Sequence, residues 1–86
     1  MNIYFSDNFL DSIKRMSPAE KKVLKKKLDL LVDNPKHPSL RTKKIKGSEG
    51  IFEASVNMDI RMTWEFYKDG ILLRNIGRHD KTLSNL

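Results

Sequence analysis

The sequence predicts an α+β fold: an N-terminal strand, two helices and then an antiparallel β-meander, with the helices packed on one face of the sheet. Apolar residues recur at helical spacing in the first part of the chain, and from residue 51 they alternate with polar ones as in a half-buried strand. Turn-forming residues at 47–50, 57–59 and 68–70 separate the alternating segments. Helices that precede a run of neighbouring strands are typical of this class.

The length and composition favour a small globular protein. The 86 residues fit one domain spanning residues 1–86, and 38% hydrophobic with 33% charged residues is a globular composition. No apolar run reaches the roughly 18 residues of a membrane span, and the first residues do not resemble a signal peptide. Cysteine is absent, which excludes disulfides, thiolate metal sites and a cysteine nucleophile. We therefore expect a soluble, cytoplasmic protein without a membrane partner.

The first expected elements are a short strand and a helix. Residues 2–6 alternate, with Ile3 and Phe5 on one face, and indicate a strand. Ser6 or Asp7 can cap the helix that follows. The apolar positions of this helix have helical spacing and should face the core: Phe9, Leu10, Ile13 and Met16.

The second helix has clear start and stop signals. Residues 17–20 read Ser-Pro-Ala-Glu, in which the serine and the glutamate can cap reciprocally and the proline occupies the first helical position. Pro35 ends the helix, because the residue before a proline is disfavoured in helical conformation. The buried stripe is expected to comprise Leu24, Leu28 and Leu31, flanked by Val23 and Leu30.

The meander is expected in residues 51–56, 60–66 and 71–76, and residues 43–45 can begin a further strand. Alternation assigns one face to the core, with Phe52, Val56, Ile60, Met62, Trp64 and Phe66. The opposite face is expected to be open and to carry Glu53, Ser55, Arg61, Thr63 and Glu65. The turn at 57–59 should bring the first two of these alongside Arg61 and Thr63. The pattern leaves open which face of the last strand is buried.

Positive charge is concentrated in one stretch. Residues 17–46 contain ten Lys/Arg and three Asp/Glu, whereas the whole chain has a net charge of +6. A concentrated basic region favours a polyanion or an acidic protein as partner, and the alternative is a solvated lysine-rich helix face that binds nothing.

Candidate chemical groups lie on the polar face and after the last strand, where the chain reads Arg78-His79-Asp80. Groups just past a strand are often catalytic, although a surface His-Asp pair and a solvated sheet face are also common. No metal site or cofactor is expected, because only one other histidine (His37) is present and the four glycines lie in turns rather than in a phosphate-binding loop. The residues are compatible with metal-free acid–base chemistry on a phosphodiester.

Four segments in this order resemble the RelE/ParE superfamily of bacterial toxin–antitoxin toxins. They are a basic stretch ending in Lys-Gly at 41–47, the strands at 50–56 and 59–65, and Ile-Gly-Arg-His-Asp at 76–80. The element order agrees over the whole chain and the motifs cover about half of it. The resemblance implies a RelE-like fold.

The resemblance also implies a function. RelE-type toxins cut mRNA in the ribosomal A site without a metal, using the 2′-hydroxyl as nucleophile, and a cognate antitoxin neutralises them. ParE-type toxins instead inhibit DNA gyrase. The resemblance favours the toxin of a type II system that inhibits translation as an endoribonuclease, with ribosome, mRNA and antitoxin as partners. The alternatives are a gyrase inhibitor without nuclease activity and a non-catalytic relic that only binds an antitoxin.

Site residues follow from the matched positions. Arg61 matches the strand arginine that binds phosphate and stabilises the transition state, and His79 matches a general acid of some nuclease branches. Glu53 is the candidate base, from its position on the polar face alone. RelE carries lysines where this chain has Glu53 and Ser55, and an aromatic residue that this chain lacks after His79. The remaining basic residues of the motifs are expected to contact RNA phosphates: Lys43, Lys44, Lys46 and Arg78.

Overall fold

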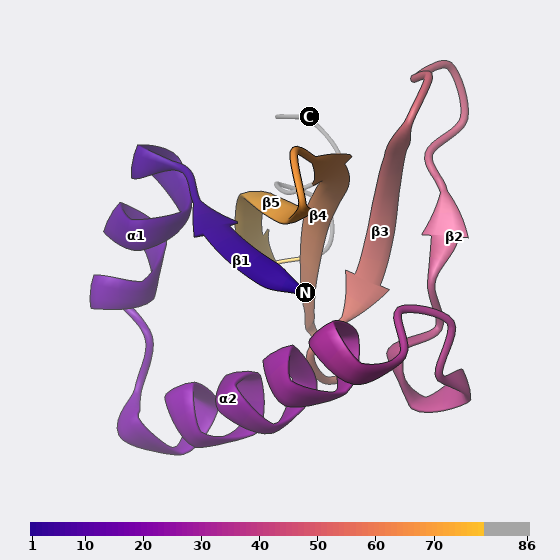
Figure 1. Ribbon diagram of the computed structural model, residues 1–86. Coiled ribbons are helices and arrows are strands. Elements are labelled where there is room, and N and C mark those ends of the chain that lie inside the picture. The colour runs from indigo at the N-terminus through magenta and orange to yellow at the C-terminus, as the bar shows by residue number, and fades with distance from the viewer. Residues whose placement is uncertain (79–86) are drawn as a thin grey trace.

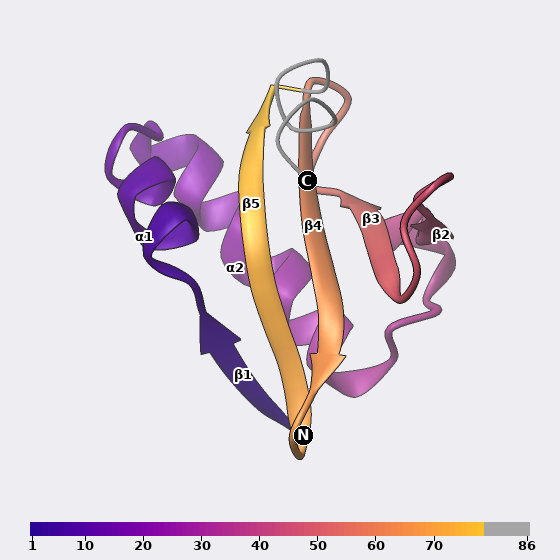
Figure 2. The same ribbon diagram turned by 90° about the horizontal axis from the view of Figure 1, so that it is seen from above.

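The computed structural model describes residues 1–78, and its architecture confirms the predicted α+β fold. Both helices lie on the same face of a single sheet, and α2 passes behind β4 and β5 in Figure 2. Within residues 1–78 no helix is long and apolar enough to cross a membrane. The elements are β1 (Asn2–Phe5), α1 (Asp7–Lys14), α2 (Pro18–Asp33), the 3-10 turn η1 (Pro38–Leu40), β2 (Lys43–Lys44), β3 (Ile51–Ser55), β4 (Ile60–Tyr67) and β5 (Gly70–Arg78).

The sheet has five strands in the order β1-β5-β4-β3-β2 (Figure 1). The predicted meander forms its centre, with β3, β4 and β5 antiparallel. The short β2 adds to β3, as the pattern at 43–45 allowed. In addition, β1 pairs parallel with β5, so the N-terminal strand closes one edge of the sheet.

The pairing of β1 with β5 depends on the start of β5. Gly70 lies opposite Asn2, and a Cβ atom at Gly70 would overlap the Asn2 carbonyl oxygen and lie 2.7 Å from its carbonyl carbon. The neighbouring Asp69 accepts hydrogen bonds of 2.6 Å from the Tyr4 hydroxyl and from the Asn2 amide. The absence of a side chain at Gly70 and the carboxylate of Asp69 therefore hold β1 in register.

The helix starts agree with the sequence signals. The Ser6 hydroxyl accepts from the Phe9 N–H at the start of α1. At the start of α2, Ser17 and Glu20 form the full capping box, with bonds of 3.1 and 2.9 Å. Each cap satisfies N–H groups that a helix leaves without intrahelical partners.

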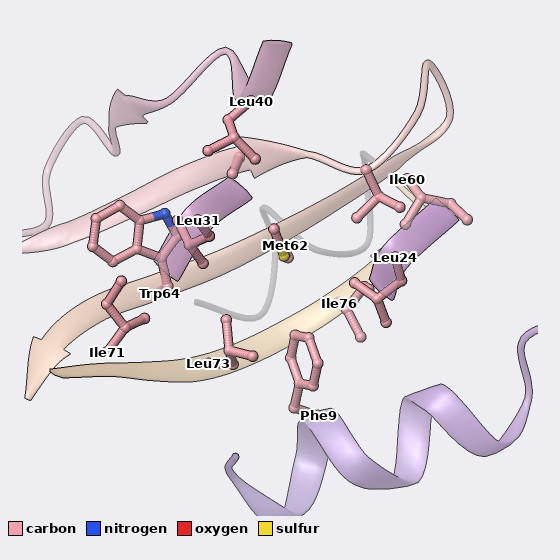
Figure 3. Packing of buried hydrophobic residues seen from close by; sticks show 12 residues of the cluster. Phe9, Leu24, Leu31, Leu40, Ile60, Met62, Trp64, Ile71, Leu73 and Ile76 are labelled. Atoms are coloured by element: carbon pink, nitrogen blue, oxygen red, sulfur yellow. The ribbon is translucent and has the colours of Figure 1, made fainter. Parts of the chain in front are cut away.

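The core lies between the helices and the sheet (Figure 3). Phe9, Leu24 and Leu31 from the helices pack with Met62, Trp64 and other apolar residues of the strands. Three predicted core positions are wrong: Leu10 and Val23 are exposed, and Phe66 is 59% exposed. Leu10 is turned about 100° from Phe9 on a helix that buries a narrow stripe. Phe66 lies next to the end of β4, where its ring packs edge-on against other strand aromatics.

An irregularity in β5 decides which of its residues face the core. Thr63 pairs with Asn75 but Trp64 pairs with Leu73, so Arg74 is an additional residue in the strand. Because of this bulge, Leu73 and Ile76 are both buried although they are three residues apart. The Asn75 N–H donates to the Thr63 hydroxyl at 3.2 Å, which satisfies one backbone group at the bulge. The buried face of β5, which alternation left open, is the one that carries these residues and Ile71.

Candidate functional site

The predicted cross-strand arrangement of the polar face is present. Glu53 pairs with Thr63 and Ser55 pairs with Arg61 across β3 and β4, as expected from the turn at 57–59. The prediction that this face is open is wrong at its centre, because Glu53, Ser55 and Thr63 are all buried. Glu53 lies between two long cationic side chains of the neighbouring strands, Arg61 and Lys43.

Those cations form an ion cluster with Glu53. The Oε1 atom of Glu53 lies 3.6 Å from Nε of Arg61 and 3.9 Å from Nζ of Lys43. The side chain of Glu53 is 3% exposed and that of Arg61 is 16% exposed, whereas that of Lys43 is 66% exposed. The Glu53–Arg61 contact is therefore a shielded ion pair, and Lys43 closes it from the solvent side.

The same arginine is held a second time by the turn between β3 and β4. Its Nη1 atom donates to the carbonyl oxygens of Asn57 at 2.6 Å and Met58 at 3.1 Å. The turn is itself ordered, because the Asn57 side-chain oxygen accepts from the N–H groups of Asp59 and Ile60 at 2.9 and 2.8 Å. A guanidinium is planar with donors in fixed directions, so contacts at Nε and Nη1 determine its orientation.

The other predicted site residues are not all in this cluster. Lys44 is in register with Phe52, and Arg78 with Ile60, which places both on the helix-side face rather than on the face of Arg61. Lys46 is exposed in the segment after β2. His79 lies outside the described residues. The structure thus brings Glu53, Arg61 and Lys43 together and separates Lys44 and Arg78 from them.

Arg78 instead borders a groove that the sequence did not predict. The groove, of about 590 Å³, lies between α1, the start of α2 and the end of β5. Arg78 reaches to 3.9 Å from both Glu20 and Asp59. The pKa of Glu20 is lowered, first by its hydrogen bond from the Ser17 N–H and further by the charge of Arg78. Only the β4–β5 register reveals that Arg78 lies on this side.

At the far end of the polar face, near the β4–β5 turn, lies a second polar group that sequence reasoning missed. The Tyr4 hydroxyl donates to Asp69, which raises the pKa of Tyr4 and lowers that of Asp69. The Tyr4 and Tyr67 rings pack edge-on with centroids 5.3 Å apart, and the Lys68 ammonium lies 5.2 Å from the Tyr67 ring centre. This group fastens β1, and the pairing of β1 with β5 was needed to recognise it.

The ion pair between Arg74 and Glu65 gives a useful comparison. Arg74, the bulge residue, lies 2.8 Å from a carboxylate oxygen of Glu65. Both side chains are partly exposed, at 33% and 28%. Among residues 1–78, no group of three or more His, Asp or Glu side chains is arranged to hold a metal ion.

Comparisons with known proteins identify the fold. No protein-family model matches the chain, and no curated protein sequence matches it. Solved structures do. The chain is similar to the toxin YafQ in the DinJ-YafQ complex of E. coli (TM-score 0.75, 18% identity, 93% of this chain and 94% of that chain). It is also similar to a YoeB/ParE toxin from Agrobacterium tumefaciens (TM-score 0.77, 11% identity, 92% and 99%).

A further match is found in the RelB-RelE antitoxin-toxin complex from Methanococcus jannaschii (TM-score 0.70, 20% identity, 91% and 92%). These similarities extend over nearly the full length of both chains in each case. The protein therefore has the RelE-like toxin fold, as the sequence motifs predicted.

Proposed function

We propose that this protein is the toxin of a type II toxin–antitoxin system and inhibits translation by cutting mRNA on the ribosome. The observation that carries the proposal is the full-length agreement with the RelE-like fold, seen with YafQ, RelE and a YoeB/ParE toxin. The oriented Arg61 on the sheet face opposite the helices supports it, because phosphodiester cleavage needs a fixed cation where negative charge develops.

The proposed reaction is an internal transesterification. The 2′-oxygen of one nucleotide forms a bond to the adjacent phosphorus, and the bond from phosphorus to the 5′-oxygen breaks. The products are a 2′,3′-cyclic phosphate and a 5′-hydroxyl. Arg61 stabilises the charge of the phosphorane, with Lys43 beside it as a more exposed phosphate contact.

Two proton transfers complete the reaction. We assign the general acid to His79, which donates a proton to the departing 5′-oxygen. His79 is two residues after Gly77, the residue opposite Arg61 in the β4–β5 ladder. Glu53, the base expected from the sequence, is enclosed between two cations, so in this proposal solvent water takes the proton of the 2′-hydroxyl.

The remaining basic residues are assigned to more distant phosphate contacts. Lys46 is exposed just after β2 and is suited to a phosphate near Lys43. Lys44 and Arg78 lie on the other sheet face, so we assign them to RNA outside the cleaved dinucleotide. Their loss should weaken binding in a salt-dependent way without changing the rate at saturation.

The proposed partners are the ribosome with its mRNA, in the cytoplasm, and a cognate antitoxin. In the DinJ-YafQ and RelB-RelE toxin–antitoxin complexes, one chain has the same fold as this protein. The net charge of +6 suits an antitoxin segment rich in Asp and Glu.

Primer extension on an mRNA in a bacterial translation system tests the proposal. New 5′ ends inside codons are expected with the wild-type protein, only when ribosomes are present, and they should be lost with Arg61→Ala and with His79→Ala. Intact mRNA together with gyrase-linked DNA breaks would instead identify a gyrase inhibitor. Intact mRNA, intact DNA and harmless expression would identify an antitoxin-binding relic.

A further inference from the structure

We infer that Glu53 is a positioning residue that orients Arg61, and that it does not accept a proton from the substrate. The inference rests on the proposed function for its catalytic consequence, but its structural part stands on the ion cluster alone. The sequence indicated a general base at Glu53, from its position on the polar face alone, and the positioning role replaces that assignment.

The carboxylate of Glu53 is withdrawn from the surface of the sheet. A general base must come within hydrogen-bond distance of the proton it removes. Glu53 is 3% exposed, and its Oε1 atom is directed at both Nε of Arg61 and Nζ of Lys43. Its Oε2 atom is buried and has no hydrogen-bond partner among residues 1–78. Neither oxygen is therefore presented to a nucleotide lying on the sheet surface.

Glu53 and the β3–β4 turn both contact the guanidinium of Arg61. The guanidinium is contacted on one edge by Glu53 through Nε and at Nη1 by the turn carbonyls of Asn57 and Met58. Glu53 comes from β3 and the carbonyls from the turn after it, so two separate backbone segments determine one orientation. Removing Glu53 removes the contact at Nε that comes from β3, and with it one of the two directions from which the guanidinium plane is fixed.

The orientation of Arg61 affects how well it stabilises the transition state of the proposed reaction. A cation stabilises a transition state best when it is already placed where the charge will develop, because no reorganisation is then needed. A displacement of about 1 Å of such a group costs on the order of 100-fold in rate. Glu53 can thus affect cleavage strongly without touching the RNA.

The decisive comparison is between Glu53→Gln and Glu53→Met in single-turnover cleavage of mRNA on saturating programmed ribosomes. Glutamine retains an acceptor oxygen of the same reach, whereas methionine retains only the shape. We expect Glu53→Gln to stay within about five-fold of wild type and Glu53→Met to lose about 100-fold in the rate at saturation. If Glu53 were the base, glutamine would also lose about 100-fold or more, and this result would overturn the inference.

Two further readouts separate positioning from a general structural role. The pH dependence of the cleavage rate should have the same form in wild type and Glu53→Gln. The double variant Glu53→Met/Arg61→Ala should be no slower than Arg61→Ala, since both changes remove the same interaction. If the loss of rate in the double variant equalled the product of the losses in the two single variants, Glu53 would act independently of Arg61.

A matched control is available on the same sheet. Glu65→Met removes the acid of the Glu65–Arg74 ion pair, which lies outside the proposed machinery, and should leave the rate at saturation unchanged. A loss equal to that of Glu53→Met would show that any broken ion pair on this sheet has the same effect. Thermal unfolding of each variant confirms that the comparison is made between folded proteins.

An NMR measurement keeps the inference independent of activity. The Nε–H signal of Arg61 should be shifted and exchange slowly with water in wild type and Glu53→Gln, and lose both properties in Glu53→Met. If the wild type cleaves no RNA, the proposed function fails, and this signal still decides whether Glu53 orients Arg61. An unchanged signal in Glu53→Met would refute the positioning role.

Discussion

The carboxylate of Glu53 and the guanidinium of Arg61 form an ion pair of 3.6 Å that joins β3 to β4 diagonally across the sheet. Both side chains are largely withdrawn from solvent. A charged pair in the middle of a small domain requires each partner to compensate the other, because an isolated buried charge is costly. The pair is thus a structural constraint as well as the centre of the proposed site.

We predict that Glu53→Ala lowers the free energy of unfolding by about 3 kcal/mol, because it removes the buried carboxylate of a shielded ion pair with Arg61. Lys43→Ala should cost less than about 1 kcal/mol, since its side chain is 66% exposed and exposed ion pairs contribute little. Urea unfolding followed by tryptophan fluorescence provides the measurement. Equal effects of the two substitutions would contradict the distinction between the shielded and the exposed partner.

Gly70→Ala should separate β1 from β5. The added Cβ overlaps the backbone of Asn2, so the strand must move away and lose its parallel pairing. The expected cost is about 3 kcal/mol, together with fast hydrogen exchange of the amides in residues 2–5. Ser48→Ala, in a turn remote from this contact, serves as the control. Unchanged protection of the β1 amides in Gly70→Ala would show that the overlap is relieved elsewhere.

Acid titration should reveal the contact between Tyr4 and Asp69. The pKa of Asp69 is lowered in the folded protein, first by the hydrogen bond from the Tyr4 hydroxyl. A lowered pKa means that the contribution to stability is present above the pKa of the unfolded chain and is lost as pH falls through the folded value. Tyr4→Phe should raise the pKa of Asp69 toward its ordinary value.

The stability difference between wild type and Tyr4→Phe should therefore narrow as the pH is lowered through the acid range. Because the pKa of Tyr4 is raised by the same contact, the difference should also narrow at strongly alkaline pH. NMR titration of the Asp69 carboxyl carbon in wild type and in Tyr4→Phe measures the first effect. An identical titration of Asp69 in both proteins would exclude the hydrogen bond in solution.

The parts of the fold that could be predicted depend on neighbouring residues. The caps at Ser6 and Ser17 involve residues three positions apart, and the β3–β4 register follows from one short turn. Alternation, which also depends only on residues close together in the sequence, assigned Ile60, Met62 and Trp64 to the core. The order of the motifs along the last three strands was sufficient to indicate the RelE-like fold.

The parts that could not be predicted depend on distant contacts or on a break in periodicity. The pairing of Asn2 with Gly70 joins the two ends of the described chain. The bulge at Arg74 shifts the inward face of β5 by one residue, and no local signal marks it. The burial of Glu53 and its contacts with Arg61 and Lys43 involve three strands, and alternation within one strand does not show them.

The central claim is that the protein cuts ribosome-bound mRNA through the 2′-hydroxyl, with Arg61 stabilising the phosphorane. The most direct measurement uses programmed ribosomes carrying a synthetic mRNA, and the same mRNA with a single 2′-deoxy nucleotide at the mapped cleavage position. The account predicts a product ending in a 2′,3′-cyclic phosphate with the first mRNA, and loss of cleavage at that position both with the second mRNA and with Arg61→Ala. Cleavage of the 2′-deoxy mRNA at the same position, or full activity of Arg61→Ala, would contradict it.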